Sequence, residues 1–342
     1  MSRLIRTRRV SVLVLAAVTV LGLAACGAEP DVDEAAVVRG PSKASAGSPG
    51  GSPFWVDPES PAARQVAEWQ RTGRPSDAEL LRRISEQPMA IWPAGEDPAA
   101  MMRAATEGAA KDGRTALFVA YDIPHRDCGQ HSAGGATSPE AYREWIDRFA
   151  VGLGDTKAVV VLEPDAVAHT VDGCTPEEYR AERFQLLSDA IDRLKRQPHT
   201  TVYLDAGNPA WITDASKLRE PLTRSGIERA DGFVLNTSNF QTDADVRSYG
   251  QELSRILGGK HFVIDSSRNG KGPLTGDRVD AWCNPPDRAL GTRPTTQTGD
   301  PLLDAFLWIK RPGESDGECR GGPAAGKWWP DYALGLARNS PA

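Results

Sequence analysis

The stretch that decides the fold reads Val-Val-Val-Leu-Glu-Pro-Asp-Ala-Val at residues 159–167. Its first four residues are apolar and mostly β-branched, which is typical of a strand buried on both faces in a parallel α/β sheet. Pro164 cannot continue a central ladder, so the strand should end there. Glu163 and Asp165 then lie at the carboxyl end of a strand, where α/β barrels place catalytic groups. Taken alone, the stretch also fits a solvated turn capped by an acid.

The sequence on either side extends this pattern. Short apolar runs alternate with amphipathic segments, and strands are predicted at residues 89–92, 116–121, 158–162, 201–204, 232–235, 262–264 and 305–309. Ser138-Pro139 predicts the start of one helix, and Thr175-Pro176-Glu177-Glu178 predicts a capping box at the start of another. Seven strands alternating with helices in 342 residues favour a single parallel α/β barrel.

Polar side chains follow most of these strands. They are Tyr121 and Asp122, Glu163 and Asp165, Asp205, Asn236, Asp265, and after the last strand Lys310, Glu314 and Asp316. In a barrel all of them lie on the same rim. The sequence therefore predicts a functional site on that rim.

The first 52 residues have a different character. Four arginines precede an apolar run at residues 10–23, so residues 1–25 are predicted to be a signal peptide. Leu23-Ala24-Ala25-Cys26 resembles a bacterial lipobox with Cys26 as the lipidated residue, although an ordinary secretion signal is the alternative. Residues 26–52 are rich in Gly, Ser, Pro and Ala and predict a flexible tether, which leaves residues 53–342 as the folded domain. We expect an exported protein, either lipid-anchored at the bacterial cell surface or secreted.

The remaining cysteines suggest two disulfides, as is usual for an exported protein. Cys128, Cys174, Cys283 and Cys319 allow three connectivities, of which the sequential one closes the shorter loops.

The net charge and the spacing of the histidines limit which substrates and cofactors are expected. The net charge is −6, and loss of residues 1–25 removes four arginines and no acids, so −6 − 4 gives −10. This acidic balance argues against nucleic acid and is compatible with an uncharged substrate. The five histidines have no HExxH or similar ligand spacing, so neither a metal nor another cofactor is expected.

Two segments carry a resemblance to a known family. Val-Ala-Tyr-Asp-Ile-Pro-His-Arg-Asp-Cys-Gly at 119–129 resembles the first signature of glycoside hydrolase family 6, and Val-Val-Leu-Glu-Pro-Asp at 160–165 resembles the second. Residues 203–207, 236–240, 282–284 and 308–317 agree in the same order. Long ordered motifs of this kind are more specific than a short pattern.

The resemblance implies an inverting β-1,4-glucanase on a distorted seven-stranded parallel α/β barrel. Asp165 is similar to the general acid of the family, and Asp127 to the neighbouring aspartate that tunes it and stabilises positive charge. Asp316 matches the candidate base, and Tyr121 matches a tyrosine that presses on the distorted sugar.

The resemblance also implies a set of substrate-binding residues. Trp92, Trp211 and Trp282 match sugar-stacking positions, and polar contacts are expected from Asp205, Asn208, Asn236, Lys310 and Glu314. The four cysteines fall at the disulfide positions of the family, which supports the sequential pairing. Asn208 stands where a histidine is frequent, and Ala133 stands where many members have a serine that helps to hold the catalytic water, so Ser132 is a candidate substitute.

We therefore predict a monomeric endo-β-1,4-glucanase whose partner is a β-1,4-glucan or cello-oligosaccharide and which touches a membrane only through its lipid. The short interval between Cys283 and Cys319 favours an open cleft over a tunnel. The alternatives are a cellobiohydrolase, another glycan hydrolase of the family, or a non-catalytic glycan-binding lipoprotein.

Overall fold

The computed structural model describes residues 52–276 and 280–341. The expected signal peptide, Cys26 and nearly all of the expected tether lie outside the described residues. Within the described part, no helix combines the length and the apolar character that a membrane span requires.

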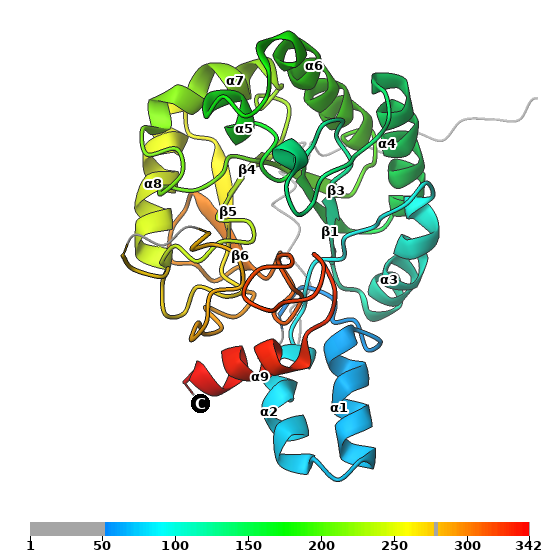
Figure 1. The fold of residues 1–342 in the computed structure, drawn as a ribbon. Coiled ribbons are helices and arrows are strands. Elements are labelled where there is room, and N and C mark those ends of the chain that lie inside the picture. Colours follow the sequence, from blue (N-terminus) through cyan, green and yellow to red (C-terminus); the bar gives the residue numbers. More distant parts are fainter. Residues whose placement is uncertain (1–51, 277–279, 342) are drawn as a thin grey trace, which may run out of the picture. The chain divides into compact units, whose positions relative to one another are not determined.

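The centre of the fold is a parallel sheet of six strands in the order β1-β2-β3-β4-β5-β6 (Figure 1). The strands are β1 (Ala116–Ala120), β2 (Ala158–Leu162), β3 (Thr200–Asp205), β4 (Gly232–Leu235), β5 (His261–Asp265) and β6 (Leu303–Leu307). β2 is paired on both sides, with Val160 opposite Phe118 of β1 and Val202 of β3. Six of the predicted strands are thus confirmed: β2 and β4 have the predicted ends, and the ends of the other four differ by one or two residues.

The predicted seventh strand at residues 89–92 is wrong. Ile91 forms only an isolated parallel bridge, with Phe118 of β1. The segment still lies between the two edge strands, because Ala90 N donates to Trp308 O at 2.9 Å and Val119 N donates to Ile91 O at 2.9 Å. Pro93 has no N–H with which to continue a ladder, so the pairing stops after one bridge. The sheet is therefore a half-barrel whose edges are joined by an irregular segment.

Alternate residues of each strand face opposite sides of the sheet, as the two-residue period requires. Val119, Val161, Val234 and Val263 belong to an inner apolar cluster. Their neighbours pack outward against the helices, as Val160 and Leu162 do. Both faces are dry, so side chains at the strand ends are the first that can reach solvent.

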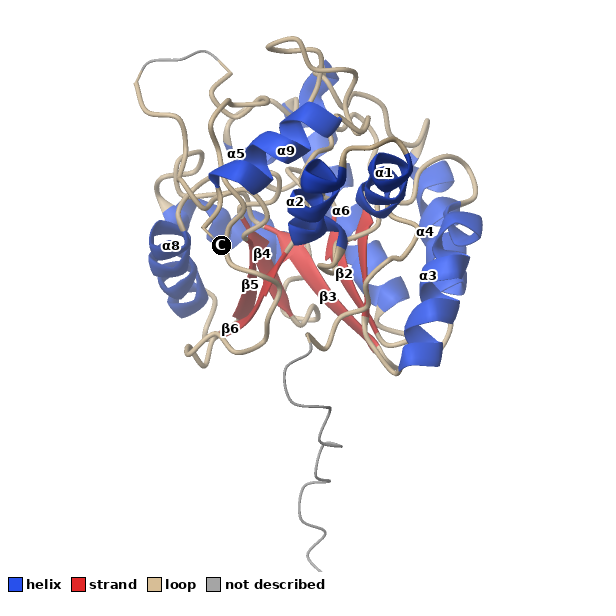
Figure 2. Ribbon diagram, turned by 90° about the horizontal axis from the view of Figure 1, so that it is seen from below, coloured by secondary structure: helices blue, strands red, loops and turns tan. Residues whose placement is uncertain are grey.

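Helices surround the sheet (Figure 2). They include α3 (Pro98–Asp112), α4 (Pro139–Leu153), α6 (Glu177–Leu194), α7 (Arg219–Arg224) and α8 (Asp243–Ile256), with short α5 (Ala168–Val171), η1 (Asp127–Gly129) and η2 (Ala215–Leu218) in the connections. α1 (Pro61–Arg71), α2 (Pro75–Ser85) and α9 (Pro330–Asn339) contribute to a separate apolar cluster that includes Trp69, Leu81 and Trp308.

The two predicted helix starts have different outcomes. Ser138 Oγ accepts a hydrogen bond from Ala141 N, which confirms it as the N-cap of α4. The predicted capping box is wrong, because α6 begins at Glu177 without a side-chain cap and Pro176 takes the N-cap position. Thr175 Oγ1 instead accepts a 2.7 Å hydrogen bond from the buried Arg183, whose guanidinium needs acceptors in a dry environment.

Candidate active site

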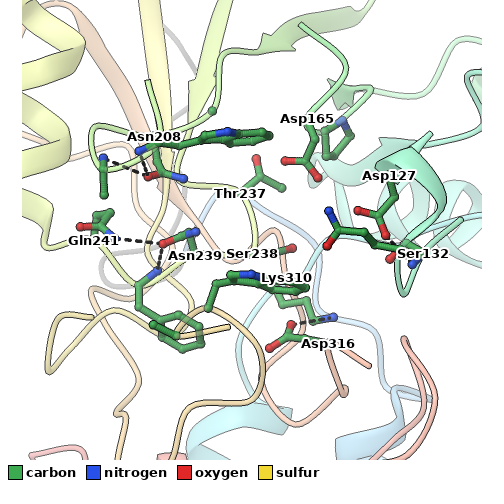
Figure 3. A pocket seen from close by; sticks show the side chains of 18 of the residues that line it. Asp127, Ser132, Asp165, Asn208, Thr237, Ser238, Asn239, Gln241, Lys310 and Asp316 are labelled. Atoms are coloured by element: carbon green, nitrogen blue, oxygen red, sulfur yellow. Dashed lines mark hydrogen bonds and ion pairs between the residues drawn. The ribbon is translucent and has the colours of Figure 1, made fainter. Parts of the chain in front are cut away.

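A cavity of about 650 Å³ opens at the carboxyl ends of the strands (Figure 3). Nine of the expected site residues line it: Trp92, Tyr121, Asp127, Asp165, Asn208, Trp211, Trp282, Lys310 and Asp316. Asp205, Asn236 and Glu314 are not among the lining residues. The rim predicted from the strand ends therefore exists, but only part of it faces the cavity.

Asp165 lies in an environment that disfavours its charge. It follows Pro164 with a left-handed φ of 71°, which turns the chain away from β2. Burial raises the pKa of Asp165 well above its usual range, and the carboxylates of Asp205 and Asp127 raise it further. A raised pKa favours the protonated form of this carboxyl group, which is the form that a general acid needs.

Asp127 is the closest partner of Asp165 within the cavity. Its Oδ2 accepts a 2.6 Å hydrogen bond from Ser132 N, which orients it from the short η1 turn. A carboxylate oxygen of Asp127, one of Asp165 and a ring nitrogen of His169 all lie within 4.8 Å of one another. Two carboxyl groups this close form the like-charge pair expected from the resemblance.

Asp316 lies in the opposite electrostatic environment. Its Oδ2 accepts from Arg268 Nη1 at 2.8 Å, and Lys310 Nζ lies 3.4 Å from its Oδ1. Burial alone would favour the neutral acid, yet the charges of Arg268 and then Lys310 outweigh it and lower the pKa of Asp316. The pKa values of Asp165 and Asp316 are therefore shifted in opposite directions.

Arg268 is a functional residue that the sequence reasoning missed. It is fully buried three residues after β5, with Nη2 donating to Ser238 O at 2.6 Å and its guanidinium 4.4 Å from the Phe240 ring. The signal that could have found it is the same strand-end position that identified the acids.

Asp205 is the clearest correction among the expected substrate-binding residues. It is 0% exposed, and its Oδ1 accepts from Asp165 N and Gly207 N, both at 3.0 Å, while its Oδ2 accepts from Thr237 Oγ1 at 2.7 Å. Every one of these contacts holds a neighbouring loop. Asp205 therefore fixes the backbone of Asp165 instead of reaching a sugar.

Asn236 and Glu314 are also buried and do not face the cavity. Asn236 Nδ2 donates to Asp265 O at 2.9 Å, and its Oδ1 accepts from Gln241 N at 3.1 Å. Glu314 Oε1 pairs with Arg311 Nη1 at 3.0 Å. Asn236 thus satisfies backbone groups that would otherwise lack partners, whereas Glu314 is engaged by a neighbouring side chain.

Two further strand-end acids follow the same rule. Glu163, buried at the end of β2, accepts from Asp122 N and Ile123 N, and burial raises its pKa to about 7. Asp265, buried at the end of β5, accepts from Ser238 N and Lys310 N. A belt of Glu163, Asp205, Asn236 and Asp265 thus holds the loops, and the residues on those loops face the cavity.

Three tryptophans line the cavity, as expected, and the protein holds the indole N–H groups of Trp92 and Trp211. Trp92 Nε1 donates to Ile309 O at 2.9 Å, and Trp211 Nε1 donates to Asp172 Oδ2 at 2.9 Å. Trp282 is 36% exposed, an unusual exposure for so large a side chain. These rings give the cavity flat apolar surfaces with fixed orientations.

A comparison with known families decides the relationship. The sequence profile described as glycosyl hydrolases family 6 matches residues 50–340.

The chain belongs to glycosyl hydrolases family 6.

Similar family 6 proteins support this assignment. Endoglucanase A of Cellulomonas fimi is 43% identical over 84% of this chain and 62% of its own length, and Endoglucanase 1 of Streptomyces halstedii is 42% identical over 82% and 87%. The solved endoglucanase Cel6 of Mycobacterium tuberculosis is 42% identical, with a TM-score of 0.77 over 85% of this chain and 98% of that chain. The chain thus spans about three fifths of the length of the Cellulomonas fimi enzyme.

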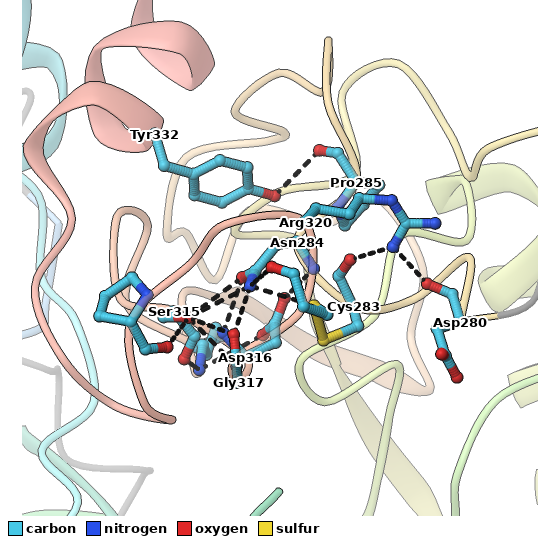
Figure 4. Close-up of a disulfide and its surroundings, with 12 residues drawn as sticks. Asp280, Cys283, Asn284, Pro285, Ser315, Asp316, Gly317, Arg320 and Tyr332 are labelled. Atoms are coloured by element: carbon cyan, nitrogen blue, oxygen red, sulfur yellow. Dashed lines mark hydrogen bonds and ion pairs between the residues drawn. A yellow bond between two sulfur atoms is a disulfide. The ribbon is translucent and has the colours of Figure 1, made fainter.

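In this family 6 chain the disulfides join Cys128 to Cys174 and Cys283 to Cys319. The second lies beside Asn284, whose N–H donates to Asp316 Oδ2 and whose Oδ1 accepts from Asp316 N (Figure 4). The first joins the turn that carries Asp127 to the segment after α5. Each disulfide therefore supports one of the two carboxyl environments, and both are typical of a protein in an oxidising compartment.

Ser132 and Ala133 differ in whether they reach the cavity. Ser132 lines the cavity, whereas Ala133 is not among the lining residues. His169 and Asp172 line it as well, and the sequence reasoning gave them no role. Neither family 6 signature includes them. They lie near Asp165 because the short helix α5 turns the chain back toward it.

Proposed function

We propose that this protein is an endo-β-1,4-glucanase that hydrolyses cellulose or soluble β-1,4-glucan with inversion at the anomeric carbon. The observation that carries the proposal is that one cavity holds Asp165, whose pKa is raised, and Asp316, whose pKa is lowered. An inverting hydrolase needs one protonated and one ionised carboxyl group. The bacterial relatives named endoglucanase are 40–43% identical and a fungal putative endoglucanase is 31% identical, whereas those named probable cellobiohydrolase C are 29% identical, which favours endo action.

In the proposed mechanism Asp165 donates its proton to the glycosidic oxygen as the bond breaks. The negative charge of Asp127 stabilises the oxocarbenium character of the transition state, and the Tyr121 ring presses on the distorted sugar. Water attacks from the opposite face of the ring. Arg268, Lys310 and Asn284 N–H already engage the oxygens of Asp316, so we propose that the proton reaches it through a water chain.

The proposed substrate follows from the lining of the cavity. Trp92, Trp211 and Trp282 offer flat surfaces to the apolar faces of glucose rings, and Asn208 and Lys310 offer polar groups to the hydroxyls. The Mycobacterium tuberculosis enzyme was solved with methyl-cellobiosyl-4-deoxy-4-thio-β-D-cellobioside, a cello-oligosaccharide analogue. That ligand supports a β-1,4-glucan as the substrate of this chain.

The test of this function is the anomer that is released. Proton NMR during early hydrolysis of cellohexaose should show α-anomeric product before mutarotation, because water attacks the face opposite the leaving group. Carboxymethyl cellulose should lose viscosity faster than it gains reducing ends, as internal cleavage requires. An initial β-anomer would exclude inversion, and binding of cellohexaose without any hydrolysis would identify a glycan-binding protein.

We expect Asp205→Asn to change the pH profile. The Asp205 carboxylate raises the pKa of Asp165, so its neutral amide should lower that pKa, and the alkaline limb of kcat should move to lower pH. The amide oxygen can still accept from Asp165 N and Gly207 N, so the loop is retained.

The matched control for this variant is Asp231→Asn. Asp231 pairs with Lys195 just before β4, at the opposite end of the strands from the cavity. It should leave the alkaline limb in place. If the alkaline limb of kcat in Asp205→Asn stays in place or moves to higher pH, then the Asp205 carboxylate does not raise the pKa of Asp165.

We also propose that the protein is exported as a monomer and anchored to a membrane by lipid on Cys26. Support comes from the lipobox-like sequence before Cys26 and from the two disulfides. Cells given labelled palmitate should incorporate it into the parent chain and not into Cys26→Ser. Equal labelling of the two would rule out this anchor.

A further inference from the structure

His169 brings a nitrogen ligand to the two acids at the centre of the cavity. Its ring nitrogen and one carboxylate oxygen each from Asp127 and Asp165 lie within 4.8 Å of one another. Atoms that coordinate zinc at about 2.0–2.2 Å lie roughly 3.4 Å apart in a tetrahedral site. Small side-chain rotations would therefore bring these three groups onto one ion.

A carboxylate orients the His169 ring, as is usual for histidines that bind metals. Its Nδ1 lies 3.3 Å from Asp172 Oδ2, so Asp172 accepts the Nδ1 proton and leaves the Nε2 lone pair available. Asp172 is itself fixed, because Trp211 Nε1 donates to its Oδ2 at 2.9 Å and Cys174 N donates to its Oδ1 at 2.8 Å. A carboxylate that orients a histidine in this way is the usual support of a zinc ligand.

The available nitrogen has no partner in the protein. His169 is only 6% exposed and lines the cavity, yet within residues 52–276 and 280–341 its Nε2 makes no hydrogen bond. In the same part of the chain, no lysine or arginine forms an ion pair with Asp127, Asp165 or Asp172. The negative charge around His169 is thus left without a cation, unlike that of Asp316.

We propose that Asp127, Asp165 and His169 form a reversible site for a transition-metal cation of the zinc type, with Asp172 as the residue that orients His169. All three residues line the cavity, so water would complete the coordination of an ion held there. Imidazole with carboxylates suits zinc, copper or nickel, whereas magnesium and calcium prefer oxygen alone. The glucanase reaction uses Asp127 and Asp165 without a bound metal.

Occupancy of this site has a consequence that rests on the proposed function. A metal on Asp165 and Asp127 takes the two carboxyl groups that the hydrolysis needs, so zinc should inhibit and a chelator should restore activity. Binding itself does not depend on that function and can be measured separately.

The test is calorimetric titration of Zn²⁺ into the chelator-treated full chain with its disulfides intact. The parent should show one site that His169→Asn weakens by about 100-fold, since a ligand is lost, and that Asp172→Asn weakens by about 10-fold or more. His199→Asn, an exposed histidine just before β3, should match the parent. Mg²⁺ at the same concentrations should give no binding heat.

The outcomes separate the two proposals. Equal zinc affinity in the parent and in both His169→Asn and Asp172→Asn overturns the site. Zinc binding that is lost in these variants supports the site even where the parent hydrolyses no β-glucan. An active parent that zinc neither binds nor inhibits removes the metal site alone and leaves the glucanase.

Discussion

Asp165→Asn is expected to lower kcat on cellohexaose by about 10²–10⁴-fold, the usual contribution of a positioned general acid. The amide cannot donate a proton to the glycosidic oxygen, and a glucosyl leaving group departs poorly without one. The amide has nearly the shape of the acid, and the backbone contact of Asp165 N with Asp205 does not involve the changed atom. The Kd for cello-oligosaccharide should therefore change little.

A substrate with an acidic leaving group distinguishes this role from a structural one. Dinitrophenyl β-cellobioside leaves without protonation, so Asp165→Asn should lose much less activity on it than on cellohexaose. The matched control is Asp155→Asn, an exposed acid on the connection before β2, which should behave as the parent on both substrates. Equal losses on the two substrates would contradict the general-acid assignment.

Arg268→Met is expected to lower the free energy of unfolding by about 3–5 kcal/mol, the usual cost of removing one partner of a buried ion pair. Arg268 is fully buried, and methionine has a similar length but leaves Asp316 with Lys310 as its one remaining cation in the described chain. The measurement is the urea midpoint together with the m-value. Activity should fall as well, because burial then favours the neutral form of Asp316.

Two further variants make this prediction specific. Arg268→Met with Asp316→Asn should recover part of the lost stability, because no charge is left unpaired. Arg229→Met removes an exposed ion pair with Asp192 and should cost no more than about 1 kcal/mol. A loss below 1 kcal/mol in Arg268→Met, similar to that control, would show that Asp316 does not depend on Arg268.

Much of the architecture could be predicted from the sequence because it depends on local patterns. Apolar runs such as the one at residues 158–162 can only be buried strands, and Pro164 must end the strand that it follows. The number of strands could not be predicted in the same way. Residues 89–92 have a strand-like composition, but Pro93 cannot continue the ladder and Ile91 forms only one bridge.

The site residues, too, could be predicted from the sequence only in part. Strand-end position alone identified Tyr121, Asp165, Lys310 and Asp316, which line the cavity. It also placed Asp205 and Asn236 on the rim, and the resemblance implied that they bind substrate. They instead hold loops, because position along a strand does not tell which backbone N–H groups lack partners. Arg268 was missed because its role is to pair with Asp316, which lies 48 residues away in the chain, and the sequence does not show that the two residues meet.

The sequence by itself determined the parallel sheet, the rim on which the chemistry lies, the likeness to family 6 and the pool of acids from which the site is drawn. The tertiary structure alone decided in which direction the pKa of each acid shifts. Asp165 and Asp316 are the same residue type with the same intrinsic pKa. They differ because Asp165 lies among the carboxylates of Asp205 and Asp127, whereas Asp316 lies beside Arg268, and folding brings these neighbours together from distant segments of the chain.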